Sequence, residues 1–119
     1  MTTEKDCIEY IRKMKYYDKE GKQISLEEFG EKVDDSSYRI IKQDQAGKYL
    51  VSTVWLGLDC NFRLGNIEKR PIIFETVVFN DEDISYSEEI YGYHTEKDAL
   101  KGHESVVLEY KKLCKESEV

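Results

Sequence analysis

The segment Tyr49–Leu58 constrains the fold most, because apolar and β-branched side chains fall on both of its faces. Side chains of this kind favour strands. A strand with two apolar faces is typical of the centre of a sheet that is covered on both sides. The preceding Gln45–Lys48 contains a glycine and predicts a hairpin turn that connects this strand to another at Tyr38–Gln43.

Two further strands are expected after this pair. Ile72–Asn80 again carries apolar groups on both faces, and Asn80–Asp83 predicts a turn. A fourth strand is predicted at Ile84–Tyr93, with an irregularity at Ser87–Glu89. Asp59–Arg70 is polar and contains glycine, so it predicts a loop between the second and third strands.

Helices are predicted at both ends of the chain. Thr95 is the expected N-cap of a C-terminal helix that continues to about Lys115. Ser25 and Glu28 form a capping box for a short helix that ends near Val33. Residues 3–14 carry apolar side chains at helical spacing and predict another helix, although Ile8, Tyr10 and Ile11 also suit a strand. The inward stripe of the C-terminal helix is Ala99, Leu100, His103, Val106, Val107, Tyr110, Leu113 and Cys114.

This order of segments predicts an α+β fold, with an antiparallel sheet of about four strands. The C-terminal helix is expected to pack across one face of the sheet, and short helices precede the sheet. We expect one domain over residues 1–119, with 1–14 as an added N-terminal helix. Because one helix covers one face, the second face, with Tyr49 and Trp55, is expected to meet the N-terminal helix, a ligand or another copy of the chain.

The composition excludes several classes of protein. The net charge is −7, and no basic stripe is interleaved with aromatic residues, which argues against direct binding of nucleic acid. No stretch approaches the apolar length that crosses a membrane. The three cysteines form no CxxC pair, and the polar N-terminus is unlike a secretory signal. These features predict free thiols in a reducing cytoplasm.

A carboxylate, thiol and imidazole set is the strongest candidate for chemistry. Asp59, Cys60, His94 and His103 are the candidate metal ligands, since zinc uses these groups, although their spacing matches no preset ligand pair. Glu75 and His103 are the candidate acid–base residues, because burial in an apolar strand raises the pKa of a carboxyl group. A paired sheet carboxylate and a hydrogen-bonded core histidine are the commoner explanations of these two residues, and they are favoured over the acid–base roles. No glycine-flanked serine or phosphate-binding loop is present, and we expect no cofactor.

A binding surface is the alternative to chemistry. Aromatic residues with polar tips are enriched at interfaces, and recognition residues often lie in loops at strand ends. Together the aromatics exceed what one helix can cover, which favours a homodimer or a partner-binding sheet. Acidic patches occur at Asp34–Asp35, Asp81–Asp83 and Glu88–Glu89. One interpretation is that they imitate the row of DNA phosphates toward a basic groove of another protein, and the commoner one is that they are solvated surface. The candidate binding residues are Trp55, Asp59, Cys60, Arg63, Tyr91 and Tyr93.

Several short strings occur in a distinctive order over roughly residues 16 to 105. They are Tyr16–Asp18, Gly21–Phe29, Tyr38–Arg39, Val51–Asp59, Pro71–Phe79, Tyr93–Ala99 and Gly102–His103. In this order the chain resembles a family of small, functionally uncharacterised proteins encoded by bacteriophages and prophages. Members often have histidine where this chain has Cys60, and they tend to start near the Tyr-Tyr-Asp segment, so residues 1–14 look like an addition.

The resemblance implies a phage origin and a bacterial cytoplasm, and it brings no established activity. The leading hypothesis is a non-enzymatic accessory protein that binds and inhibits a host or defence protein. One alternative is a small hydrolase, with or without zinc, that uses Asp59, Cys60, Glu75 and His103. Another is a sponge that holds a small nucleotide between aromatics at a dimer seam, with Arg63 or Arg70 beside it.

Overall fold

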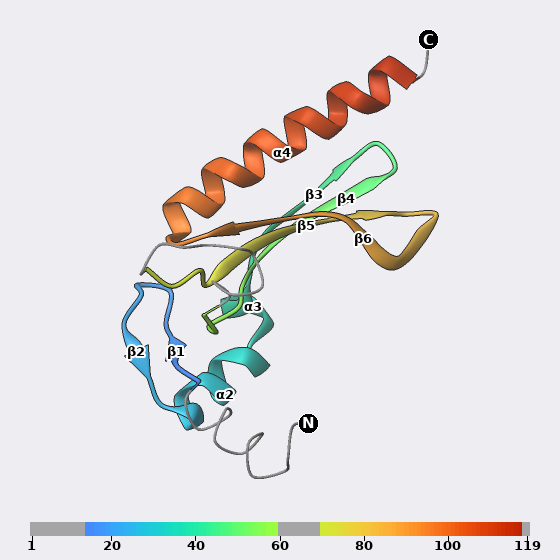
Figure 1. The fold of residues 1–119 in the computed structure, drawn as a ribbon. Helices are drawn as coiled ribbons and strands as arrows, with labels where there is room; N and C mark the ends of the chain where they lie inside the picture. Colours follow the sequence, from blue (N-terminus) through green and yellow to red (C-terminus); the bar gives the residue numbers. More distant parts are fainter. Residues whose placement is uncertain (1–13, 60–69, 118–119) are drawn as a thin grey trace, which may run out of the picture.

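The computed structural model describes residues 14–59 and 70–117. Within these ranges the fold is α+β, as predicted (Figure 1). The helix expected at 3–14 and the loop residues 60–69, with Cys60 and Arg63, lie outside the described residues, apart from Met14. In chain order the elements are β1 (Tyr16–Tyr17), β2 (Gln23–Ile24), α2 (Leu26–Asp34), α3 (Ser36–Arg39), β3 (Ile40–Ala46), β4 (Tyr49–Trp55), β5 (Phe74–Asn80), β6 (Asp83–Tyr93) and α4 (Glu96–Ser117).

The four long strands form one antiparallel sheet in the order β3-β4-β5-β6. The hairpin between β3 and β4 closes at Gly47, whose φ of 61° is a conformation that glycine adopts without strain. Opposite the predicted irregularity in β6, the register shifts between Val78 and Phe79, which pair with Glu89 and Ser87. Glu88 is therefore the extra residue of a β-bulge.

The capping signals read from the sequence are confirmed. The hydroxyl of Thr95 accepts a hydrogen bond from the backbone N–H of Asp98 at the start of α4, at 3.1 Å. The hydroxyl of Ser25 accepts from the N–H of Glu28 at 3.2 Å, where α2 begins. Each bond satisfies a backbone donor that the first helical turn leaves without a partner.

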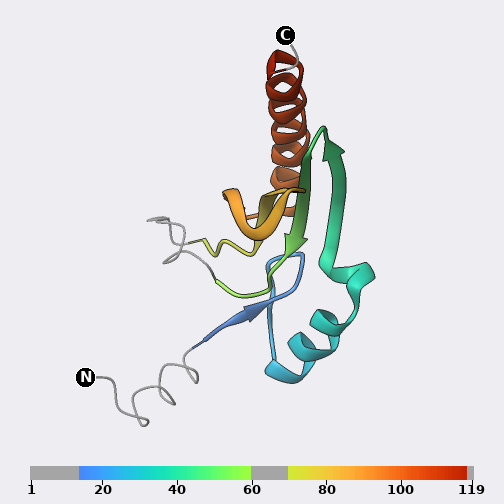
Figure 2. The same ribbon diagram turned by 90° about the vertical axis from the view of Figure 1, so that its right-hand side faces the viewer.

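Helix α4 lies along one face of the sheet and contacts all four long strands (Figures 1 and 2). Most of the predicted inward stripe is buried, but Leu100 is 39% and Leu113 is 47% exposed. Their exposure places these two residues at the margins of the stripe. No helix in the described ranges is long and apolar enough to cross a membrane. The buried residues of the stripe are Ala99, His103, Val106, Val107 and Tyr110.

The core between α4 and the sheet consists of two apolar clusters. One surrounds Val51, Val78 and Tyr110. The other surrounds Trp55, whose ring lies 5.0 Å from that of Tyr38 and whose indole N–H donates to the carbonyl of Tyr17 at 3.0 Å. Helices α2 and α3 and the β1–β2 ribbon therefore cover the end of the sheet where β4 terminates (Figure 2).

The expectation that Tyr49 and Trp55 occupy the face opposite the C-terminal helix is wrong. Both belong to the core on the α4 side, where Tyr49 packs at 4.7 Å from Tyr110 and Trp55 is 1% exposed. Alternation along β4 places Leu50, Ser52 and Val54 on the other face instead. The sequence identified the two faces of this strand correctly but not which of them α4 covers.

Candidate functional site

A chain of polar side chains crosses the interior between α4 and the sheet. Thr53 of β4 pairs with Thr76 of β5 in the register, so their side chains share the face toward α4. His103 belongs to α4, and Asp44 lies on the edge strand β3. The two threonines and His103 have 0% exposed surface. This polar chain separates the two apolar clusters of the core.

Short hydrogen bonds connect the members of this chain. The distance from Thr53 Oγ1 to Thr76 Oγ1 is 2.5 Å, and from Thr53 Oγ1 to His103 Nδ1 it is 2.6 Å. His103 Nε2 lies 2.7 Å from Asp44 Oδ2. Tyr93 extends the chain to β6 by a hydrogen bond with Thr76.

One arrangement of protons satisfies the links from Asp44 to Thr76. The carboxylate of Asp44 only accepts, so with a neutral imidazole His103 donates from Nε2, and Nδ1 accepts from the hydroxyl of Thr53. Thr53 then accepts from Thr76. In the described ranges no buried side-chain nitrogen or oxygen is left without a partner. The chain thus avoids the cost of unsatisfied polar groups in an apolar core.

The ionisable groups at the two ends respond to these contacts. The hydrogen bond from His103 lowers the pKa of Asp44 below its ordinary value. Burial raises the pKa of Tyr93, and the hydrogen bond with Thr76 offsets part of that rise. Both shifts favour the protonation states that the chain requires, a charged Asp44 and a neutral Tyr93.

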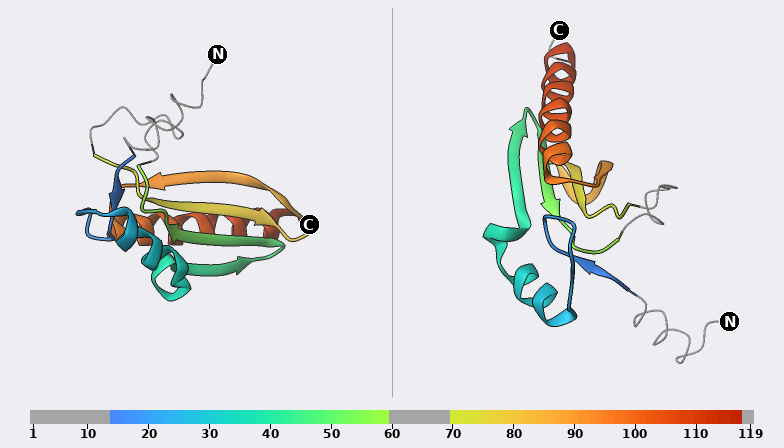
Figure 3. Two further views of the ribbon diagram at one scale, coloured as in Figure 1. Left: turned by 90° about the horizontal axis from the view of Figure 1, so that it is seen from below. Right: turned by 90° about the vertical axis from the view of Figure 1, so that its left-hand side faces the viewer.

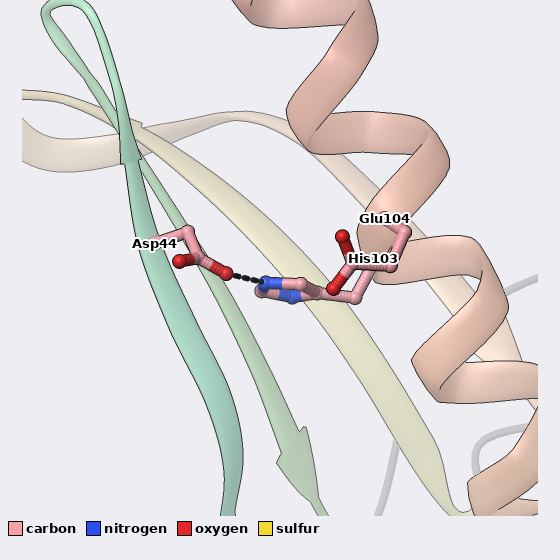
Figure 4. A group of neighbouring side chains, drawn as sticks. All are labelled: Asp44, His103 and Glu104. Carbon is pink, nitrogen blue, oxygen red and sulfur yellow. Dashed lines mark hydrogen bonds and ion pairs between the residues drawn. The ribbon is translucent and has the colours of Figure 1, made fainter.

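At its outer end the polar chain reaches a small cluster of charged side chains at the surface. Figure 4 shows Asp44, His103 and Glu104 of this cluster. Lys42 Nζ lies 2.5 Å from Glu104 Oε1 and 4.0 Å from Asp44 Oδ2. The hydrogen bond and charge of Glu104 raise the pKa of Lys42. The side chains of Asp44 and Glu104 are 39% and 56% exposed, so the cluster is open to ions from solution.

The order Asp44, His103, Thr53 matches the carboxylate, imidazole and hydroxyl of a catalytic triad. The burial contradicts that role. A nucleophile must contact its substrate, and neither the Thr53 hydroxyl nor the imidazole of His103 has exposed surface. In this conformation the polar chain of side chains is a structural element of the core.

The predicted hydrolase cluster is not assembled among the described residues. Glu75 is 8% exposed and pairs with Val54, so it points to the face opposite His103. Asp59 is exposed and raises the pKa of Tyr17 after the larger effect of burial. The ring of His94 hydrogen-bonds the carbonyl of Pro71 at 3.0 Å. Each of these residues contacts different neighbours. The sequence alone therefore could not show that they do not come together in one site.

The predicted binding residues are also divided. Trp55 is buried and cannot hold a ligand in this conformation. Tyr91 packs against the core toward α4 and donates its hydroxyl to Glu89, and burial raises its pKa. Tyr93 covers Gly102 of α4. These aromatics are core and boundary residues, so they do not form an exposed stacking platform within one copy of the chain.

Sequence analysis missed Asp44, Thr53, Thr76, Lys42 and Glu104. The available signal was indirect. His103 lies in the apolar stripe of α4, and a buried imidazole requires hydrogen-bond partners. Threonines at inward positions of two neighbouring strands were the partners in reach, but the strand register that joins them is not visible in the sequence.

A second surface feature is the sheet face opposite α4, which we call the open face (Figure 3, left). The paired residues Leu50 and Phe79 are half-buried there, and Ile90, opposite Val77, is 43% exposed. At the outward positions of β4 and β5 the one charged residue is Glu75, and it is buried. The apolar residues of the open face are Leu50, Val54, Val77, Phe79 and Ile90.

No family model, curated protein or solved structure matches the chain.

Proposed function

We propose that the protein is a small phage-encoded accessory protein that binds another protein through its open face and performs no catalysis. The open face carries this proposal, because apolar side chains from β4, β5 and β6 gather there and Ile90 is 43% exposed. An apolar surface surrounded by polar groups is typical of protein interaction sites. The resemblance to phage proteins supports a host or defence protein as the target.

The charge of the molecule indicates the chemistry of the partner. Asp81 and Glu82 are exposed at the turn between β5 and β6, and Glu88 and Glu89 are exposed on β6. With a net charge of −7, the protein favours a partner whose apolar patch is bordered by lysine or arginine. Two copies of this acidic chain repel one another, so the homodimer is the alternative outcome rather than the leading one.

The interior supports a binding role over the hydrolase alternative. A hydrolase that used His103 would need the imidazole to reach solvent, and it has no exposed surface. Glu75, the other candidate acid–base residue, faces away from His103. Exposing His103 would break its two hydrogen bonds, with Thr53 and with Asp44.

Affinity capture from bacterial lysate with matched variants tests the proposal. Ile90→Lys places a charge on the open face, whereas Leu108→Lys alters a residue of α4 that is 68% exposed. We expect wild type and Leu108→Lys to retain the same partner, Ile90→Lys to lose it, and added salt to weaken capture. Each captured protein is then purified and its binding measured by calorimetry.

Other outcomes contradict the proposal. One is a captured partner that the Ile90→Lys variant still binds. Another is wild-type protein that captures nothing. The third is wild-type protein that self-associates in size-exclusion chromatography, with Ile90→Lys abolishing the association. The last result would assign the open face to a homodimer. Hydrolysis of a substrate that His103→Gln abolishes in a folded variant would restore the enzyme alternative.

A further inference from the structure

The charged cluster at the end of the polar chain has the ligands of a metal site. Among the described residues, Asp44, His103 and Glu104 are the one group of three potential ligands whose donor atoms all lie within 4.8 Å of one another. The group offers one imidazole nitrogen and two carboxylate oxygens (Figure 4). An imidazole with carboxylates suits Zn²⁺ and similar transition metals better than Mg²⁺ or Ca²⁺.

The buried threonines provide an independent reason to expect a metal there. A histidine that binds a metal through Nε2 usually donates its Nδ1–H to a second group, which fixes the ring and the tautomer. Thr53 Oγ1 lies 2.6 Å from His103 Nδ1, in the position of that second group. Hydroxyls both donate and accept, so the direction of the hydrogen bonds in the polar chain can reverse. His103 then donates to Thr53, Thr53 to Thr76 and Thr76 to Tyr93.

We propose that Asp44, His103 and Glu104 bind a divalent transition metal of the zinc type. His103 changes tautomer and keeps one ring proton: it loses the proton on Nε2 to solvent, takes up one from solvent at Nδ1, and donates the Nε2 lone pair to the metal. The carboxylates of Asp44 and Glu104 each supply one oxygen, and water completes the coordination shell. Asp44 reaches the site from β3, and His103 and Glu104 reach it from α4 (Figure 4). Because the carboxylates of Asp44 and Glu104 are 39% and 56% exposed, the metal stays accessible to solvent.

Lys42 is the internal competitor for this site. Its ammonium group lies 2.5 Å from Glu104 Oε1 and provides positive charge at the outer side of the cluster. A metal must displace this ammonium group, which remains charged and turns to solvent. Replacing Lys42 by a neutral residue should therefore strengthen metal binding. The same replacement of a surface lysine far from the site should not.

Calorimetric titration of the full chain with Zn²⁺, together with NMR of the histidine rings, tests the site. We expect Lys42→Met to tighten binding several-fold and Lys97→Met, at an exposed position in the first turn of α4, to leave it unchanged. Glu104→Gln and Asp44→Asn should each weaken binding by about tenfold or more, and His103 resonances should shift when metal is added. Glu104 is exposed, so its variant is expected to fold.

Three results would overturn the proposal. One is the absence of Zn²⁺ binding by wild type at millimolar concentration. Another is binding that Glu104→Gln and Asp44→Asn leave unchanged. The third is binding that leaves the His103 resonances in place, which would assign the metal to cysteine thiols or to His94. The outcome does not depend on whether the open face binds a partner.

Discussion

A single methyl group at Gly102 tests how closely α4 meets the sheet. This glycine lies inside α4 and faces the ring of Tyr93. A Cβ at position 102 would lie 2.2 Å from Tyr93 Cε1, 2.3 Å from its hydroxyl oxygen and 2.4 Å from Cζ. Atoms cannot approach this closely, so in Gly102→Ala the ring must leave its place against α4 and its hydrogen bond with Thr76.

The magnitude follows from three contributions. Replacing glycine by alanine inside a helix favours folding by about 1 kcal/mol. Displacing a packed ring costs about 1–3 kcal/mol, and losing one hydrogen bond costs about 1 kcal/mol. Gly102→Ala should therefore lower the free energy of unfolding by about 1–3 kcal/mol, although helix propensity alone predicts the opposite sign.

Gly30 in α2 supplies the matched control. Nothing lies within 4 Å of a Cβ built at this position, so Gly30→Ala should raise the free energy of unfolding by about 0.5–1 kcal/mol. Urea denaturation can be followed by the fluorescence of Trp55, the single tryptophan of the chain, which is 1% exposed. If Gly102→Ala is as stable as Gly30→Ala, the packing of Tyr93 on α4 is refuted. In a Tyr93→Leu background the penalty at position 102 should disappear.

Three further predictions concern buried and capping groups. Thr53→Val removes the partner of His103 Nδ1 and one of the two partners of the Thr76 hydroxyl. It should cost about 1–3 kcal/mol in urea denaturation, more than Ser52→Ala on the opposite face; equal costs would contradict the buried chain. A hydrogen bond from Ser37 lowers the pKa of Asp35, so the stability it gives is present above the unfolded-state pKa of about 3.9 and is lost as pH falls through the folded value. The advantage of wild type over Asp35→Asn should vanish at low pH in denaturation curves, and an advantage that persists would refute the cap. Burial raises the pKa of Tyr91 and Tyr110, so their stabilising effect should fade as pH rises above about 10, and tyrosinate absorbance from them should appear only with unfolding.

The sequence predicted most helices and strands because their signals are local, but Tyr38 and Arg39, expected to begin a strand, belong to helix α3. The caps at Ser25 and Thr95, the hairpin at Gly47 and the bulge near Glu88 each depend on residues close together in the chain. The amphipathic stripe of α4 likewise required only helical periodicity, and only its marginal residues were misjudged.

The site was not predictable in the same way because its members come from different strands and a helix. His103 was identified, but its partners Asp44 and Thr53 lie 59 and 50 residues away in sequence. Trp55 was misjudged because β4 is apolar on both faces, so no pattern showed which face α4 covers. Strand register and helix placement are tertiary information that short strings do not carry.

Hydroxyl-radical footprinting of the protein before and after incubation with bacterial lysate tests the open face most directly. The account predicts protection at Leu50, Phe79 and Ile90, while Leu108, 68% exposed on the far side of α4, keeps its reactivity. Protection confined to the outer surface of α4, or no protection anywhere, would contradict a binding role for the open face.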